Sequence, residues 1–545
     1  MTGARRRGAE DRHAALERWV WWAAATAASA ALFLLLTPEI LGLFHDDAIY
    51  AAVAKSLAEG NGYHLVNLPG APPQTKYPPG FSSLLALIWR VFPGFPENAR
   101  ALKSLNLVFV LIAARSLAAV TRAQNPTLAI AVPILAQLAL VTNPGLVGFT
   151  DYTMTDVCFS ALVVAAIAVF RKGERLTSWR EAALISLVGG SILARSIGIA
   201  LAAAIALTCA VRRQYARSLV YLGVGAAVFL VWTSWALAHR ELSSPILTYY
   251  QEYESPALVH LLVNPPLAVS IVAGNVRMAI DALPLVVGPS WLGAWPVLAA
   301  LATAGTWRML STGWIAPVLF SACYLGLVLL HPFAPHRYLV PLMPIFVLAI
   351  TAGAEAGWDL LRRALPRVRA SSLPAVIVLA IVSASNLVWV QYRLRSGETV
   401  RGWYGIDLGY RWSGFQETFH WIRTNTSADA KIGSLYDAMY FLYTGRQGVR
   451  PWIHRSETYF YPYGAASPDV GAPELVLPEL RRLGIAFIVL DPSAGYVEGP
   501  AAMAMLRQLL LMPEAGAVRV FVSGDGEHEI YRLWTNTIPA RLPNR

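Results

Sequence analysis

The sequence predicts a mainly α-helical, polytopic membrane protein that carries a small soluble α/β domain at its C-terminal end. Of the 545 residues, 56% are hydrophobic and only 14% are charged, and the mean hydropathy is +0.48. These values lie outside the usual range of soluble globular chains. Long apolar runs recur as far as residue 391, and the stretch that follows is polar and rich in turn residues.

The apolar runs predict about eleven membrane spans. The first, Trp19 to Ile40, follows a basic leader at residues 1–18 and exceeds the roughly 20 residues needed to cross a bilayer. A cleaved signal peptide is the competing interpretation of this run, but its length and the many later runs favour a span. The ten other runs lie at 104–120, 127–142, 156–170, 181–194, 197–211, 218–237, 290–306, 314–331, 338–357 and 372–391. The predicted membrane domain therefore covers residues 19–391.

The distribution of positive charge predicts the orientation. The net charge of +11 is concentrated in short segments between apolar runs, which indicates membrane orientation rather than a nucleic-acid partner. The predicted inner segments carry Arg122, Arg171, Lys172, Arg175, Arg180, Arg212, Arg213, Arg217, Arg308, Arg362, Arg363, Arg367 and Arg369. The predicted outer segments are 41–103, 143–155, the turn at Arg195, 238–289 and 332–337. We expect an inner (plasma) membrane protein whose active site and C-terminal domain are extracytoplasmic.

Residues 392–545 predict a soluble outer α/β domain. Trp421-Ile422-Arg423 is typical of a helix end, and Pro478 to Leu483 of a helix between strands. Buried strands are expected at Lys431 to Leu435 and Phe487 to Leu490. Arg519 to Val522 and Glu529 to Leu533 flank Gly524-Asp525-Gly526, which indicates a hairpin.

The most informative segment is the predicted first outer loop, residues 41–103, called the first loop below. Asp46 and Asp47 precede a helical pattern that ends at Gly60, and Phe81 to Val91 is an apolar stretch too short to span. Helix capping is the plain explanation for Asp46. Two adjacent carboxylates exceed what a cap requires, and they repel each other unless a proton, a cation or a polar substrate is shared.

Several short motifs follow one another along the chain: Asp46-Asp47, Gly62-Tyr63, Lys76-Tyr77-Pro78-Pro79-Gly80, Thr155-Asp156, Arg195, His336-Arg337-Tyr338 with Pro341 and Pro344, and Trp421-Ile422-Arg423. In this order they resemble the GT-C membrane glycosyltransferases, and in particular the protein O-mannosyltransferase and lipid A aminoarabinose transferase superfamily. The chain departs from that pattern at Asp47, because Asp-Asp stands where the family often has Asp-Glu.

The resemblance implies transfer of a single sugar from a polyprenyl-phosphate-linked donor to an envelope glycan, lipid or protein on the outer face, without a cofactor. Such a reaction needs a base for the acceptor and positive charge for the departing phosphate. The resemblance makes Asp46 the base and places Asp47 with it among the catalytic residues. Asp156 is expected to orient the acceptor or a donor hydroxyl, with Asp151 as its alternative.

The expected donor- and phosphate-binding residues are Lys76, Tyr77, Arg195, His336 and Arg337. Arginine binds phosphate oxygens through a planar fork, and lysine binds as a point charge. Each charge also has a structural explanation: a solvated loop for Lys76, snorkelling for Arg195, topological anchoring for Arg337 and helix capping for Asp156.

Other features favour no further site. His45, His64, His331 and His336 lack a metal-ligand spacing, so no metal site is predicted. Tyr249, Tyr250 and Tyr253, with Glu252 and Glu254, suit an interfacial aromatic belt better than an acceptor path. A flippase of polyprenyl-linked glycans is the main rival function, although no half-to-half repeat supports a transporter. An O-antigen-ligase-like enzyme and a noncatalytic envelope scaffold are further alternatives.

Overall fold

A computed structural model describes most of the chain. The described residues are 2–125, 129–171, 177–241, 244–251, 263–287, 295–331, 337–364, 372–395, 412–453, 470–492 and 499–534. They divide into two compact units. Unit 1 comprises Met1–Thr37, Lys103–Trp232 and Val272–Trp403, and unit 2 comprises Pro38–Leu102, Thr233–Ile271 and Tyr404–Arg545.

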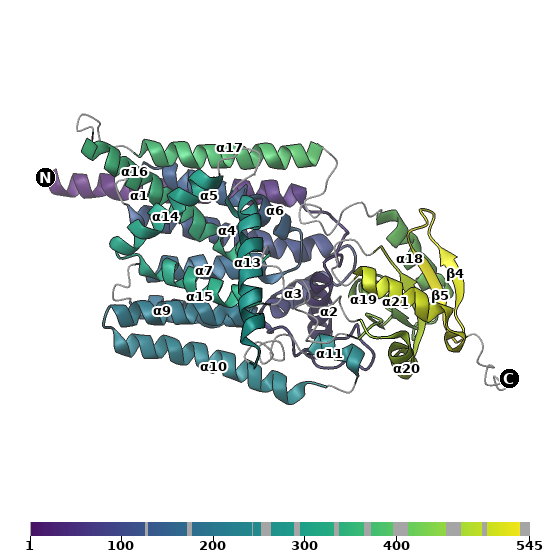
Figure 1. Cartoon of the computed structure of the whole chain (residues 1–545). Coiled ribbons are helices and arrows are strands. Elements are labelled where there is room, and N and C mark those ends of the chain that lie inside the picture. The colour runs from purple at the N-terminus through teal and green to yellow at the C-terminus, as the bar shows by residue number, and fades with distance from the viewer. Residues whose placement is uncertain are drawn as a thin grey trace. The chain divides into compact units, whose positions relative to one another are not determined.

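The described residues of unit 1 form helices and the connections between them. Each of the eleven predicted apolar runs overlaps one of them, and Figure 1 shows several running side by side, among them α9 and α15. The helices are α1 (Thr2–Leu35), α4 (Ala99–Gln124), α5 (Ala131–Val141), α6 (Pro144–Thr150), α7 (Thr155–Phe170), α8 (Ser178–Ala194), η1 (Ser196–Gly198), α9 (Ile199–Val211), α10 (Tyr215–His239), α13 (Pro265–Val287), α14 (Trp295–Ser311), α15 (Ile315–Leu329), η3 (Arg337–Leu342), α16 (Met343–Ala364) and α17 (Leu373–Arg395). The ends of α4, α10 and α13 extend into unit 2.

The length and hydropathy of the helices support a membrane protein. Fewer helices meet the criterion for a full span than the roughly eleven spans that the sequence predicts. Among the described residues, four helices are long and apolar enough to cross a membrane: Ala99–Gln124, Tyr215–His239, Arg337–Arg363 and Leu373–Tyr392. The pair α5 and α6, bent by 59°, adds a fifth if it forms one span. Exposed leucines and valines cover α10, for example Leu219, Leu230 and Val231, as expected for a helix that faces lipid.

Ion pairs join several helices of unit 1 near their ends. At one end, basic residues pair with acids of neighbouring helices: Arg217 bonds Glu181 at 3.0 Å, and Arg308 bonds Asp359 at 2.5 Å. These residues lie at the start of α8 and α10 and toward the end of α14 and α16. Arg195 follows the opposite end of α8, and Arg337 lies at the start of η3, just before α16. Both arginines pair with Asp156 at the start of α7. The basic ends are those that the sequence predicts to be cytoplasmic.

Two glycines allow α14 and α16 to pack at very short range. A Cβ added to Gly305 would lie 1.8 Å from the carbonyl oxygen of Ala349, and one added to Gly353 would lie 1.9 Å from that of Leu301. A real Cβ atom cannot lie so close to an oxygen, so only glycine fits at these two positions. Small residues at helix crossings are the usual means of close packing in membranes, where the hydrophobic effect between helices is absent.

Unit 2 joins the first loop, the segment around residue 250 and the C-terminal part of the chain. Its first-loop helices are α2 (Asp46–Ala58) and α3 (Gly80–Val91), and α11 (Pro245–Gln251) follows α10. From Trp412 onward, which we call the C-terminal domain, the helices are α18 (Trp412–Asn425), α19 (Asp437–Thr444), α20 (Pro473–Leu483), α21 (Gly499–Leu511) and η6 (Pro513–Ala515).

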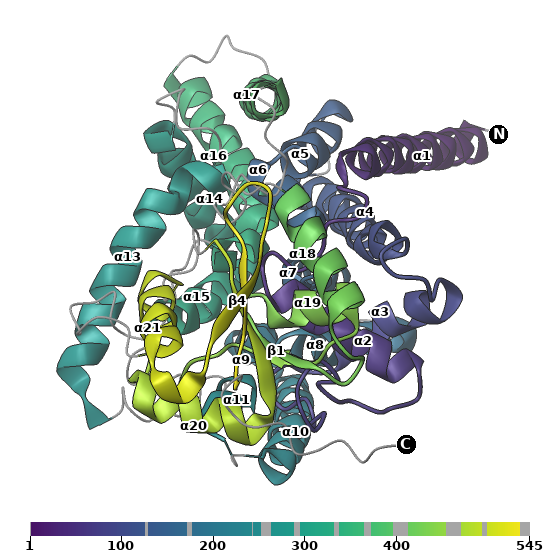
Figure 2. The same cartoon turned by 90° about the vertical axis from the view of Figure 1, so that its right-hand side faces the viewer.

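The C-terminal domain is built on a mixed five-stranded sheet with the order β2-β1-β3-β5-β4. The strands are β1 (Lys431–Gly433), β2 (Gly448–Val449), β3 (Ile485–Leu490), β4 (Val518–Val522) and β5 (Glu529–Arg532). The first three are parallel, and β4 and β5 form the predicted antiparallel hairpin. In Figure 2, α20 and α21 lie on one side of the sheet and α18 and α19 on the other. The small α/β fold of this domain, with its helices and strands, confirms the prediction.

Candidate functional site

The two acidic residues of the first loop occupy different environments at the start of α2. Asp47 is fully buried, and its carboxylate accepts backbone N–H bonds from Gly42 at 2.9 Å and from Ala48 at 3.0 Å. Asp46 is partly exposed, and its Oδ1 accepts a hydrogen bond from the Tyr77 hydroxyl at 2.9 Å. Neither residue is the helix cap, because His45 occupies that position without a side-chain capping bond. The capping explanation of Asp46 is therefore wrong.

The residue before the pair has an unusual backbone. His45 has φ 67° and ψ −59°, and the Asp46 N–H bonds the carbonyl of Phe44 at 2.9 Å. This is the rarer, strained form of the γ-turn. The side chain of His45 is buried, and its Nε2 lies 2.8 Å from Oδ1 of Asp437 in the C-terminal domain. Burial, followed by the positive charge of Arg450, lowers the pKa of His45, which favours the neutral ring.

Lys76 and Tyr77 lie in the same unit as Asp46. The Lys76 ammonium lies 3.7 Å from the centre of the Tyr249 ring and donates to the Tyr249 carbonyl at 3.1 Å. The guanidinium of Arg450 approaches the same ring at 5.3 Å and donates to its hydroxyl at 3.2 Å. Tyr249 therefore contacts two cations, one from the first loop and one from the C-terminal domain.

In unit 1, the structure brings together three of the predicted residues. Asp156 is fully buried in the first turn of α7, and its Oδ1 accepts a bond from Nη1 of Arg195 at 2.5 Å. Nε of Arg337 lies 3.1 Å from Oδ2 of the same carboxylate. The two arginines retain 11% and 15% exposure. One carboxylate between two guanidiniums leaves a net charge of +1, which suits an anionic ligand.

Buried hydroxyl groups without a hydrogen-bond partner occur near this carboxylate. They belong to Thr155 and Ser160, on the same helix as Asp156, and to Tyr324 of α15. The Tyr324 ring stacks on Phe159 at 5.8 Å. Such hydroxyls are uncommon in protein interiors, where polar groups are nearly always paired.

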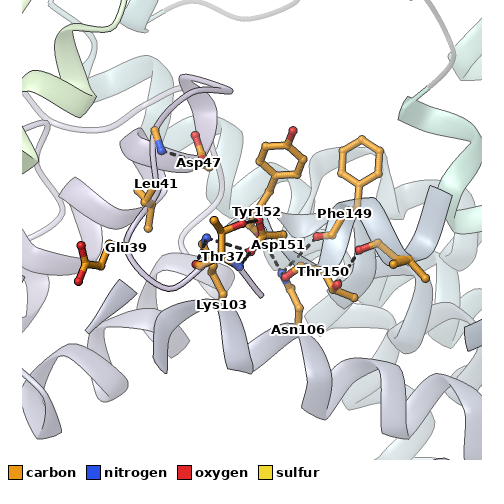
Figure 3. Close-up of polar contacts among 12 residues, drawn as sticks. Thr37, Glu39, Leu41, Asp47, Lys103, Asn106, Phe149, Thr150, Asp151 and Tyr152 are labelled. Atoms are coloured by element: carbon orange, nitrogen blue, oxygen red, sulfur yellow. Dashed lines mark hydrogen bonds and ion pairs between the residues drawn. The ribbon is translucent and has the colours of Figure 1, made fainter. Parts of the chain in front are cut away.

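Asp151, the alternative to Asp156, belongs to a separate structural contact. Figure 3 shows Asp151 beside Lys103 and Thr37, with Asn106 donating to the neighbouring backbone carbonyls. The Lys103 ammonium bonds Oδ1 of Asp151 at 2.9 Å and the carbonyl of Thr37 at 2.7 Å, and Lys103 and Asp151 are both fully buried. This pair ties the end of α1 to α4 and to the loop before α7.

Some predicted site residues lie outside the described residues. Two residues that contact the first loop or Tyr249 were not predicted. His336, Glu252, Tyr253 and Glu254 fall outside the described ranges. Asp437 and Arg450 were not predicted, because they stand in a polar stretch without a motif. Within the described ranges, no group of three or more histidine, cysteine or acidic side chains is arranged to hold a metal.

No protein-family model and no curated protein matches this chain, whereas solved structures do. The archaeal oligosaccharyltransferase AglB from Archaeoglobus fulgidus, in complex with an inhibitory peptide and a dolichol-phosphate, is similar with a TM-score of 0.55 at 11% identity, covering 96% of this chain and 75% of that one. ArnT from Cupriavidus metallidurans bound to undecaprenyl phosphate has a TM-score of 0.53 at 15% identity, over 95% and 98% of the two chains. The apo state of that ArnT gives 0.55 at 16% identity, with the same coverage.

These similarities show the fold of the chain. It is the GT-C fold, over about 95% of the length, as the short motifs predicted. Together with the apolar helices, the fold indicates an integral membrane protein. The comparisons do not single out the protein O-mannosyltransferase branch.

Proposed function

We propose that this GT-C-fold protein is a glycosyltransferase that moves a single sugar from a polyprenyl-phosphate-linked donor to a cell-envelope glycan, lipid or protein, with Asp46 as the base. The observation that carries the proposal is the different environment of the two adjacent carboxylates. Asp47 is buried between backbone amides, whereas Asp46 is partly exposed and bonded to Tyr77. We infer from this difference that Asp47 supports the turn and that Asp46 is the carboxylate that meets the substrate.

The proposed reaction is a single displacement. The carboxylate of Asp46 takes the proton of an acceptor hydroxyl or amine while the acceptor atom forms a bond to the anomeric carbon of the sugar. The bond from that carbon to the phosphate oxygen breaks, and the phosphate retains the electron pair. The sugar is transferred with inversion, and polyprenyl phosphate is released. A positioned base contributes about 10²- to 10⁴-fold to such a reaction.

Arg195 and Arg337 are the proposed phosphate ligands, with Lys76, Tyr77 and His336 as further donor-binding residues. The arginines are partly exposed and share one buried carboxylate, so their planar forks are held ready for phosphate oxygens before the donor arrives. In the proposed reaction their charge stabilises the negative charge that develops on the leaving phosphate.

The test is reconstitution of the purified protein in liposomes with a panel of undecaprenyl-phosphate-linked sugars and an envelope extract as acceptor. We expect the wild type to transfer sugar from at least one donor, and Asp46→Asn to lose about 100-fold or more of the rate, because asparagine accepts no proton. Asp429→Asn, the same change at an exposed position of the C-terminal domain, is the matched control. It should transfer at the wild-type rate.

Undiminished transfer by Asp46→Asn would exclude Asp46 as the base. A flippase gives a different result in the same liposomes. Labelled donor would become accessible on the opposite leaflet without any product, and Asp46→Asn would leave that movement unchanged. Transfer that requires Asp46 therefore separates the proposed enzyme from a transporter.

A further inference from the structure

Helix α19 of the C-terminal domain packs directly on the turn that leads into α2. Gly42, at φ 109°, has no room for a side chain, because a Cβ there would lie 2.6 Å from Cβ of Met439. Three residues later, the ring of His45 bonds Asp437, the first residue of α19. The turn between Gly42 and Asp46 is therefore shaped by a helix that lies almost 400 residues later in the chain.

Asp437 accepts hydrogen bonds from the first loop. Besides His45 Nε2 at 2.8 Å, the amide of Asn67 donates to Oδ2 at 3.2 Å. Asp437 is fully buried, as are both of its partners. A buried carboxylate is costly unless its oxygens are bonded. The two contacts therefore specify where the first loop sits on this domain.

The strained backbone of His45 requires such a contact. A non-glycine residue at φ 67° is strained and persists only where the surrounding structure determines its conformation. The turn sets the direction in which the chain enters α2, and Asp46 is the next residue. A loss of the side-chain contact would allow the turn to relax and would move the carboxylate of Asp46.

We propose that Asp437 is a positioning residue for Asp46, and that the C-terminal domain completes the catalytic site by holding the strained turn at His45. The inference rests on the proposed role of Asp46 and extends it to a domain for which the sequence offered no function. Asp437 touches no reacting atom; it acts through His45.

A second buried histidine–aspartate pair in the same domain provides the matched control. His528 bonds Asp491 at 3.2 Å, and Asp491 also accepts from Ser434 at 2.7 Å and Tyr440 at 2.6 Å. All of these partners belong to the C-terminal domain. Asp491→Asn and His528→Asn therefore perturb the domain as Asp437→Asn and His45→Asn do, without touching the first loop.

The experiment compares these four full-length variants with the wild type in the liposome transfer assay. We expect Asp437→Asn and His45→Asn to lower kcat about 10- to 100-fold, because a displacement of about 1 Å at a catalytic group has effects of this order. KM for the undecaprenyl-phosphate sugar should change less than about twofold, since the donor contacts are intact. Asparagine at position 45 replaces the imidazole with a smaller polar side chain.

A second readout needs no activity. Amide hydrogen exchange of residues 46–50 should be faster in Asp437→Asn than in the wild type, and unchanged in Asp491→Asn. Unchanged exchange there in Asp437→Asn, or an equal fall of kcat in the control pair, would overturn the inference. If the wild type transfers no sugar, the proposed function fails, and hydrogen exchange alone still decides whether Asp437 holds this turn.

Discussion

Asp156 is a single buried carboxylate that holds two arginines, and each arginine is expected to have its own share in anion binding. Arg337→Ala should weaken the binding of undecaprenyl phosphate to the purified protein by about tenfold or more, because hydrogen bonds to charged groups contribute about 1.5–3 kcal/mol. Arg337→Lys should be intermediate, since it retains the charge without the planar fork. Native mass spectrometry with added undecaprenyl phosphate measures the change.

The control for this prediction is Arg217→Ala, at the start of α10, whose partner Glu181 lies at the opposite end of α8 from Arg195. Arg217 is also a half-buried arginine in an ion pair, with Glu181 at 3.0 Å. Its loss should leave the affinity within about twofold of the wild type. Equal weakening in both variants would assign the effect to stability and remove Arg337 from the phosphate site.

The lowered pKa of His45 predicts that unit 2 becomes less stable in acid. Its pKa in the folded protein is lowered below the ordinary value of 6.5, first by burial and then by Arg450. The unfolded chain therefore binds this proton more readily than the folded chain. Stability is fully present above about pH 6.5 and is lost as the pH falls toward the lower, folded pKa, by at most about 1.4 kcal/mol per pH unit.

The measurement is the thermal midpoint of the purified protein between pH 7.5 and pH 5. We expect the midpoint of the wild type to fall over this range, and His45→Asn to show a smaller fall from a lower starting value. Parallel curves for the two proteins would contradict the assignment of the acid sensitivity to His45.

At the scale of elements, the crossing of α14 and α16 depends on glycine. Gly353→Ala should destabilise the protein by about 1–3 kcal/mol, because its methyl group would meet the carbonyl oxygen of Leu301 and force the helices apart. Gly357→Ala lies one turn later on α16, where nothing approaches within 4 Å. It should be neutral or stabilising, because alanine favours the helix by up to about 1 kcal/mol.

The midpoint of SDS-induced unfolding distinguishes the two variants. The intrinsic preference for helix predicts the same small gain at both positions, whereas helix packing predicts a loss at Gly353 alone. A stabilised Gly353→Ala would show that the two helices separate at little cost.

For the whole molecule, the sequence predicted those elements that local patterns of apolar and turn residues determine. Each apolar run overlaps a helix, and the hairpin at Gly524-Asp525-Gly526 was correctly placed. Helix α13 was missed, because Asn275, Arg277 and Asp281 interrupt its apolar pattern. Asp156, Arg195 and Arg337 were found because charges near apolar runs are conspicuous. The pairing of His45 with Asp437 leaves no local signal and requires the folded chain.

The pairing of His45 with Asp437 also bears on how the protein is made. The two residues are 392 positions apart, and chains grow at about 5–20 residues per second. About 20–80 s therefore separate the synthesis of the turn from the synthesis of the residue that holds it. During that interval α2 lacks its anchor. A ribosome that stalls before Asp437 would leave a nascent membrane protein that has its proposed base but cannot yet position it.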